Sequence, residues 1–210
     1  MGKKFELTDK FVINSFGIKL FQIKCTKSFK YAQKGDFGGY VEKEGNLDQE
    51  NDAWVYGNAQ VHGNAWVSGD AQVYGNAWVY GDAWVYGNAQ VYGNAQVYGD
   101  ARVYGDARVS GNAWVSGDAR VYGNAQVYGD ADIENDNDHC GFDGFGSCNR
   151  HTHAYMTKEK KVEIICGCFR GSIEEFEKKV EETHSGTVYE KQYKSIINVI
   201  KIKFGLTDFT

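Results

Sequence analysis

Several common features are missing from this sequence of 210 residues, and each absence excludes a class of protein. It contains no proline, and no apolar run reaches the length of about 18 residues that a transmembrane helix needs. The first ten residues are polar, without the apolar segment of a signal peptide. Five cysteines in a chain without an export signal are expected to stay reduced. Together these absences predict a cytoplasmic protein without membrane contact.

Lysine is absent from residues 51–134, which carry eight aspartates, one glutamate and three arginines, a net charge of −6. Residues 1–40 have the opposite sign, with eight lysines against three carboxylates, a net charge of +5. The solenoid faces are acidic, and along them a phosphate backbone would find cations only near the N-terminal cap and at Arg102, Arg108 and Arg120. The charge pattern therefore argues against duplex nucleic acid as a partner.

The middle of the chain is a repeat of fourteen consecutive hexads, Gly/Asn–Asn/Asp–Ala–x–Val–x, from Asn51 to Glu134. Side chains two residues apart in a strand share one side, so the alanines and valines line an interior and the intervening residues point outward. The Gly-Asn or Gly-Asp pair suits a tight corner. Each hexad thus predicts a short strand and a turn, stacked at about 4.8 Å by parallel pairing. Such a regular short repeat is typical of a β-solenoid.

The hexads resemble those of the left-handed parallel β-helix, in which three hexads close one triangular coil. The match extends from about Val41 to Glu134, with Val41 and Leu47 in the alanine column. A narrower resemblance rests on the lead-in KGDFGGYVEKEGNLDQENDAWVYGNA, the hexads and the tail CGCFRGSIEEFEKKVEETH. These resemble a group of phage- and prophage-borne solenoid proteins, and the bacterial YdcK-like proteins share the lead-in and the hexads. The resemblance implies the fold, its handedness, a viral origin and a bacterial host, but no established activity.

The expected fold is mainly β: a parallel β-helix between two caps. Residues 1–40 are expected to form a β-rich N-terminal cap, because FVINSFGIKLFQIKC alternates around an Asn-Ser-Phe-Gly turn. Residues 41–134 form the solenoid and 135–150 a polar, Gly-rich exit loop. Residues 151–210 predict a small ββαα cap, with strands at HTHAYMT and KVEIICGCF. Ser172 and Glu175 form a capping box for a helix to about Glu182, and a second helix follows Gly186.

An alanine and valine interior leaves the aromatic side chains outside. With three hexads per coil, residues 18 apart stack in columns, and all five tryptophans are expected to point outward. Such ladders stabilise coil stacking, or they form interfaces, since Tyr and Trp dominate interface hot spots; both interpretations stay open. The candidate binding residues are Tyr80, Tyr98 and Trp78 on one face and Tyr86, Tyr104 and Trp84 on another.

One corner column stacks Asp82, Asp100 and Asp118, whose carboxylates repel unless they are neutralised. Arg102 and Arg120 follow two of these aspartates and are candidates for that role as well as for binding. A bound cation is the alternative.

Cysteine and histidine cluster beyond the repeat as Cys140, Cys148, His151 and His153. Thiolates and imidazoles are zinc ligands, so these four are weak candidates for a metal site, although their spacing matches no standard zinc finger. The favoured expectation is no metal and no cofactor.

Hexapeptide-repeat proteins include many acyltransferases, but their sites usually need loops inserted between the coils and a histidine base. Here the hexads contain no insertion, and His62 is their only histidine. The sequence therefore predicts a non-enzymatic binding or scaffold protein, with acyltransferase as the alternative. Its expected partners are further copies of itself, as a dimer or trimer, and an unknown host protein or small nucleotide ligand.

Overall fold

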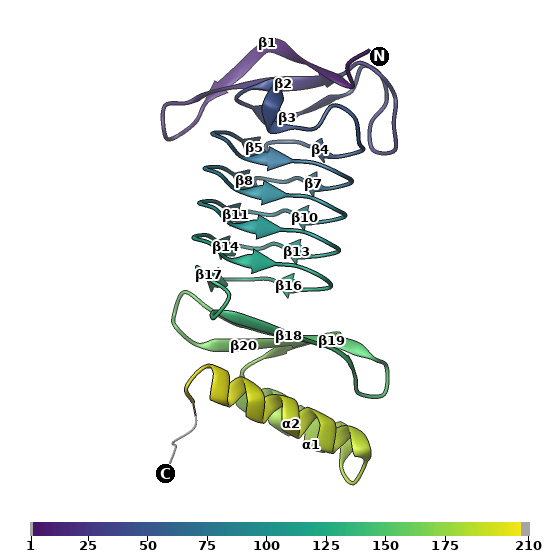
Figure 1. Ribbon diagram of the computed structural model, residues 1–210, viewed down its shortest axis with the longest axis vertical. Coiled ribbons are helices and arrows are strands. Elements are labelled where there is room, and N and C mark those ends of the chain that lie inside the picture. The colour runs from purple at the N-terminus through teal and green to yellow at the C-terminus, as the bar shows by residue number, and fades with distance from the viewer. Residues whose placement is uncertain (1, 207–210) are drawn as a thin grey trace.

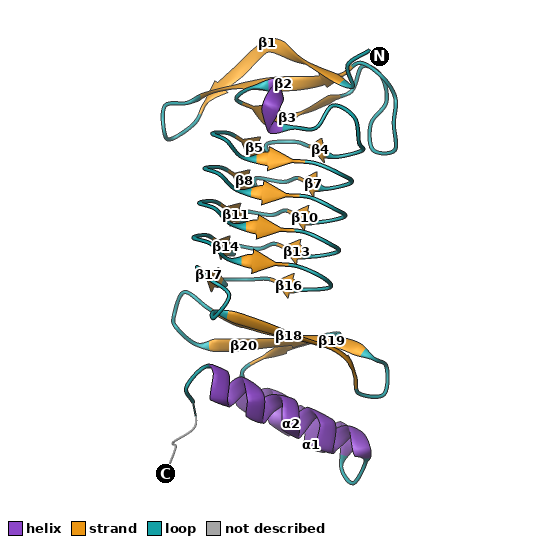
Figure 2. Cartoon of the chain, in the orientation of Figure 1, coloured by secondary structure: helices purple, strands orange, loops and turns teal. Residues whose placement is uncertain are grey.

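The computed structural model describes residues 2–206, and these form an upright rod with a cap at each end (Figure 1). The N-terminal cap lies at the top, the coils lie in the middle, and a sheet followed by two helices lies at the bottom. Helix is confined to the C-terminal layer apart from one short turn in the N-terminal part (Figure 2). No helix in this part of the chain is long and apolar enough to cross a membrane.

The coils consist of strands of two residues that form three parallel sheets, here called the left, right and front faces after their positions in Figure 1. The left face contains β5 (Gln60–Val61), β8 (Trp78–Val79), β11 (Gln96–Val97), β14 (Trp114–Val115) and β17 (Asp132–Ile133). The right face contains β4 (Trp54–Val55), β7 (Gln72–Val73), β10 (Gln90–Val91), β13 (Arg108–Val109) and β16 (Gln126–Val127). The front face contains β6 (Trp66–Val67), β9 (Trp84–Val85), β12 (Arg102–Val103) and β15 (Arg120–Val121).

The predicted inside and outside of the repeat are confirmed. The hexad alanines and valines are at most 3% exposed, so they form one continuous core. Neighbouring coils pair in register, as when the N–H of Tyr86 donates to the carbonyl of Val103 at 3.0 Å. At the corners the glycine is required: Gly87 has a φ of +71°, and a Cβ there would lie 3.0 Å from the nitrogen of Gly105.

The winding is left-handed, as the resemblance implied. In Figure 1 the front strands run from left to right while the chain descends from the N-terminal cap to the C-terminal cap. A coil whose near side moves right as it descends is left-handed.

The register of the first coil differs from the prediction. Val41 pairs with Val61 and Leu47 bridges Val67, a separation of 20 residues, so both stand in the valine column rather than the alanine column. The two additional residues lie between Leu47 and Ala53, where the chain makes a wider corner. Gly39 takes the alanine position, because a Cβ there would lie only 2.7 Å from the carbonyl of Ala59.

The N-terminal cap contains the predicted hairpin. Strands β1 (Phe5–Ile13), β2 (Lys19–Cys25) and β3 (Phe37–Val41) are antiparallel, and β3 pairs in parallel with β5, so the cap extends the left sheet. A short 3-10 turn, η1 (Glu44–Asn46), follows. Trp54 stands at a hexad position predicted to point outward, but it is only 1% exposed and belongs to the buried core, because the cap rings of Phe5 and Phe29 pack on it.

The C-terminal cap differs from the predicted exit loop and ββαα unit. It has four strands, β18 (His139–Phe145), β19 (Arg150–Met156), β20 (Val162–Cys166) and β21 (Phe169–Gly171), then α1 (Ile173–His184) and α2 (Val188–Lys203). The loop prediction was wrong over β18, whose glycines suggest a turn but whose backbone pairs with β19. The capping box of Ser172 and Glu175 is confirmed.

Alternation along the cap strands gives the sheet two different sides. His139, His153 and Tyr155 share the side that faces the last coil, where Tyr155 joins the solenoid core. The other side carries Ala154, Ile164 and Cys166 into a second core with the two helices. The sheet therefore closes the solenoid and supports the helices at once.

Candidate functional site

The aromatic columns predicted from the repeat are present as stacked ladders. Tyr86 and Tyr104 lie with ring centroids 4.9 Å apart on the front face, and Tyr104 and Tyr122 lie 5.3 Å apart below them. On the left face Tyr80 and Tyr98 are 5.0 Å apart. The stacking interpretation is thus confirmed for these columns, whereas the interface interpretation stays a prediction.

The left face is partly covered by the chain itself. Phe16, in the turn between β1 and β2, contacts the rings of His62, Trp78 and Tyr80 with centroids 5.6 to 5.8 Å apart. His62 is 3% exposed beneath it, and burial lowers the pKa of its imidazole. Trp78, Tyr80 and Tyr98 are half-buried.

The front face keeps its two tryptophans and its last tyrosine exposed, while Tyr86 and Tyr104 are half-buried. Trp66 and Trp84 are 40% and 42% exposed, and Tyr122 at the lower end is 54% exposed. Arg102 lies over the ring of Trp84, with its guanidinium carbon 5.4 Å from the ring centroid, a cation–π contact. Trp84, Tyr86, Tyr104 and Arg102, which the sequence proposed as binding residues, therefore meet on one surface.

Arg120 belongs to the same face but pairs differently from the prediction. Its Nε donates to Asp136 at 2.8 Å, and its backbone N–H donates to the other oxygen of that carboxylate at 2.9 Å. The pairing lowers the pKa of Asp136 against the opposing effect of burial. Asp136 follows the last hexad, so Arg120 ties the exit segment to the last coil instead of pairing with Asp118.

The corner columns carry hydrogen-bonded amides. Asn58, Asn76, Asn94, Asn112 and Asp130 form a continuous ladder, each amide donating to the next residue at 3.1 to 3.3 Å. Asn64 donates to Asp82 at 3.0 Å in another column. Among residues 2–206, no three or more carboxylate, imidazole or thiol groups are arranged to hold a metal ion.

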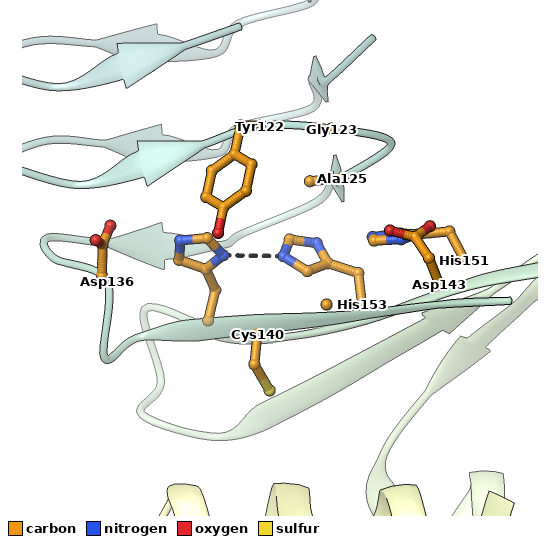
Figure 3. A pocket seen from close by; sticks show the side chains of 10 residues that line it. Tyr122, Gly123, Ala125, Asp136, Cys140, Asp143, His151 and His153 are labelled. Carbon is orange, nitrogen blue, oxygen red and sulfur yellow. Dashed lines mark hydrogen bonds and ion pairs between the residues drawn. The ribbon is translucent and has the colours of Figure 1, made fainter. Parts of the chain in front are cut away.

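The cysteines and histidines proposed as weak zinc candidates do not converge. In Figure 3 the side chain of Cys140 points away from His151 and His153, toward the helices. Its neighbours belong to the helical core, and burial raises the pKa of its thiol to about 11. Cys148 lies exposed in the turn after β18. Strand alternation separates the two kinds of ligand, because Cys140 and His153 lie on opposite sides of the sheet.

The histidines instead line a cleft of about 290 Å³ between the last coil and the C-terminal sheet (Figure 3). Tyr122, Gly123 and Ala125 border it from the solenoid. Asp136, His139, Cys140, Gly141, Asp143, His151 and His153 border it from the exit segment and the cap.

A chain of hydrogen bonds fixes the protonation of two of these imidazoles. His153 Nδ1 lies 2.8 Å from the carbonyl of Gln126, which can only accept, so this nitrogen carries a proton. Burial, with repulsion from His139, lowers the pKa of His153 to about 3, so its Nε2 is an acceptor at neutral pH. His139 Nδ1, 3.1 Å away, must then be the donor, which leaves His139 Nε2 as a lone pair.

His151 forms a second hydrogen-bonded pair. Its Nδ1 lies 2.8 Å from the carboxylate of Asp143, and this contact lowers the pKa of the Asp143 carboxyl. The Nε2 atoms of both His139 and His151 are buried without a hydrogen-bond partner within residues 2–206. A buried polar atom without a hydrogen-bond partner costs free energy, so these two nitrogens are candidate hydrogen-bonding groups for a ligand in the cleft.

Sequence reasoning named His151 and His153 but missed His139, Asp143 and Tyr122 as members of one site. The signal was the spacing of two in His139, Gly141 and Asp143, which puts all three on one side of a strand. Three glycines over Gly141–Gly146 hid that pattern.

Comparison with known families agrees with this architecture. The family model described as YdcK Beta solenoid repeat matches residues 71–88, 95–111, 101–117 and 113–129. A search of curated proteins gives no match. The matched ranges cover β7 to β9 and β11 to β16, which include strands of all three faces. The central coils of this chain are thus YdcK-type β-solenoid repeats.

Proposed function

We propose that this protein is a non-enzymatic binding protein that assembles with further copies of itself through the front face. The observation that carries the proposal is the exposure of Trp66 and Trp84 beside the Tyr86 to Tyr122 ladder. Extended exposed apolar patches are uncommon on monomers. On the left face Phe16 covers the upper part, and the exposed Trp114 at the lower end has the ammonium of Lys158 over its ring.

The charges of the front face suit a contact between like surfaces. Arg102 projects from its strand, while Asp100 and Asp118 occupy the adjoining corner, so each copy offers both signs along one edge. Arg beside Trp is typical of interface hot spots. Two or three copies with parallel axes satisfy this pattern, as the resemblance to left-handed β-helix proteins implies.

The wider role that we propose is that of a scaffold in the cytoplasm of a bacterial host, encoded by a phage and directed at a host protein. The lead-in, repeats and tail quoted above support this origin. The rigid rod of coils supports the scaffold role, because its two caps lie at opposite ends.

Solution mass tests the assembly. Light scattering after size exclusion should give two or three chains at micromolar concentration. Trp84→Ala should weaken the assembly about thirtyfold, because truncating an aromatic hot spot costs about 2 kcal/mol. Gln72→Ala on the right face is the matched control and should leave the mass unchanged. A monomer of 23.5 kDa, or an oligomer indifferent to Trp84→Ala, would contradict the proposal.

Acyltransferase activity is the second candidate, and the surroundings of His62 speak against it. The imidazole is buried under Phe16, and its Nε2 has no partner within residues 2–206. A buried histidine with a lowered pKa is shielded from any substrate on the left face. Calorimetric titration with an acyl-donor cofactor should therefore show no specific binding. Micromolar binding that disappears in His62→Ala would support the enzyme instead.

A further inference from the structure

We propose that the cleft between the last coil and the C-terminal sheet binds a planar, uncharged heteroaromatic ring that carries N–H groups, the chemistry of a nucleobase. Tyr122 is its stacking platform, and Nε2 of His139 is its hydrogen-bond acceptor. The site does not depend on assembly through the front face, since all of its residues belong to one chain.

The cleft lies below Gly123, where the front face has no further coil beneath it. The corner glycines from Gly63 to Gly111 each have backbone of the next coil 2.7 to 3.1 Å from the position of a Cβ. At Gly123 nothing lies within 4 Å. Tyr104 stacks from above on Tyr122, the neighbour of Gly123, and the front-face ladder ends at Tyr122. A planar ring in the cleft would continue the ladder, and stacking on an aromatic side chain is worth about 1–3 kcal/mol per base.

The cap supplies acceptors. His139 is 8% exposed, and its Nε2 is a lone pair without a partner, held by the chain of hydrogen bonds through His153 to the carbonyl of Gln126. His151 Nε2 is a second acceptor when Nδ1 of the same ring carries the proton and donates a hydrogen bond to Asp143. A ligand that satisfies them must donate, through ring N–H or amino groups.

The solenoid supplies donors. In the coil above, the N–H of Tyr104 donates to Val121 at 3.0 Å and the N–H of Asp106 donates to Gly123 at 2.9 Å. The equivalent N–H groups of Tyr122 and Asn124 have no backbone carbonyl to meet within residues 2–206. Donors above and acceptors below match a ring edge that has both carbonyl and N–H groups.

Charge and size narrow the ligand further. Asp136 and Asp143 both border the cleft, and Arg120 is already paired with Asp136, so a phosphate would meet net repulsion. The volume of about 290 Å³ is at the small end of ligand pockets and suits a base or nucleoside. His153 uses both ring nitrogens within the protein, which leaves His139 and His151 as separate acceptors and not as a metal set.

Titration calorimetry on the full chain tests this site with adenosine, guanosine, cytidine and uridine as probes, and with ribose 5-phosphate as the control. At least one nucleoside should bind with a dissociation constant below about 1 mM, and ribose 5-phosphate should not bind. Tyr122→Leu should weaken binding about tenfold or more. Tyr74→Leu, on the right face, should leave it unchanged.

The variant His139→Asn tests the role of Nε2 as an acceptor while preserving the fold. The Asn amide can keep the donor that meets His153, and it removes Nε2. This variant should bind the nucleoside at least about fivefold more weakly, because one hydrogen bond to the ligand is lost. Its melting temperature should stay close to that of the wild type. On addition of the nucleoside, the nitrogen resonance of His139 Nε2 should shift in the wild-type protein. No binding by any of the four probes up to several millimolar, or binding untouched by both variants and without the resonance shift, would overturn the proposal.

Discussion

Replacing Ala95 by Leu is expected to lower the free energy of unfolding by about 1–3 kcal/mol or more. Ala95 is 0% exposed in a central coil, and the interior is lined on every side by alanine and valine. Coils above and below are fixed by backbone hydrogen bonds of about 2.9 Å, so the triangle cannot widen at one level without breaking its pairing. Overpacking of this kind forces side chains off their rotamers.

The neighbouring Gln96→Leu is the matched control, because it adds an apolar side chain at the adjacent position of the same strand. Gln96 is half-buried and accepts a hydrogen bond from the hydroxyl of Tyr80 at 3.2 Å. Losing that bond should cost about 1 kcal/mol at most. Chemical denaturation of both variants measures the difference, and equal losses would mean that inside and outside are wrongly assigned.

Acidification from about pH 6.5 to 3 is expected to destabilise the protein by roughly 5 kcal/mol through His153 alone. Its pKa is lowered to about 3 by burial and by repulsion from His139. Between these two pH values the unfolded chain binds a proton that the folded chain does not. Stability from this group is therefore fully present above pH 6.5 and is lost as the pH falls toward 3.

Denaturation at several pH values, with His153→Asn beside the wild type, isolates this effect. Asparagine can keep the donor toward Gln126 and removes the titrating ring. Between pH 6.5 and 3, the free energy of unfolding of the variant should fall less steeply than that of the wild type. The remaining fall should be the part that protonation of the carboxylates causes in both proteins. Cys148→Ser, at an exposed turn, should keep the wild-type profile. Parallel profiles for His153→Asn and the wild type would show that the imidazole is not buried in its neutral form.

The solenoid could be predicted because its determinants are local and repeated. Ala, Val and Gly recur at positions that decide inside, outside and corner within a single hexad, and the same environment recurs 18 residues later. The columns of Tyr86 and Tyr104, and the amide ladder from Asn58, followed from that arithmetic alone.

Features outside the repeat depend on contacts that no local pattern encodes. Trp54 has the sequence environment of Trp84, but one is buried and the other exposed, because Phe5 and Phe29 arrive from the cap. Val41 was misplaced because two extra residues follow Leu47, and only pairing with Val61 shows this. The cleft was missed because it needs β18, Tyr122 and His153 together, from separate parts of the chain.

The caps also explain why one repeat yields three unlike faces. Phe16 covers the upper left face, and Lys158 places its ammonium 3.8 Å from the ring centroid of Trp114 at the lower end of that face. The front face receives the Arg120 and Asp136 pair at its lower end, while Trp66 and Trp84 keep their exposure. The ends of the rod thus decide how much of the aromatic surface supplied by the hexads stays exposed.

Oxidative footprinting of the tryptophans across a concentration series tests the front-face assembly most directly. Trp114 on the left face is 38% exposed, close to the 40% and 42% of Trp66 and Trp84, so it is an internal control. From nanomolar to high micromolar protein, the reactivity of Trp66 and Trp84 should fall severalfold while that of Trp114 stays constant. If Trp66 and Trp84 remain as reactive as Trp114 at every concentration, the front face is not the surface through which this protein assembles.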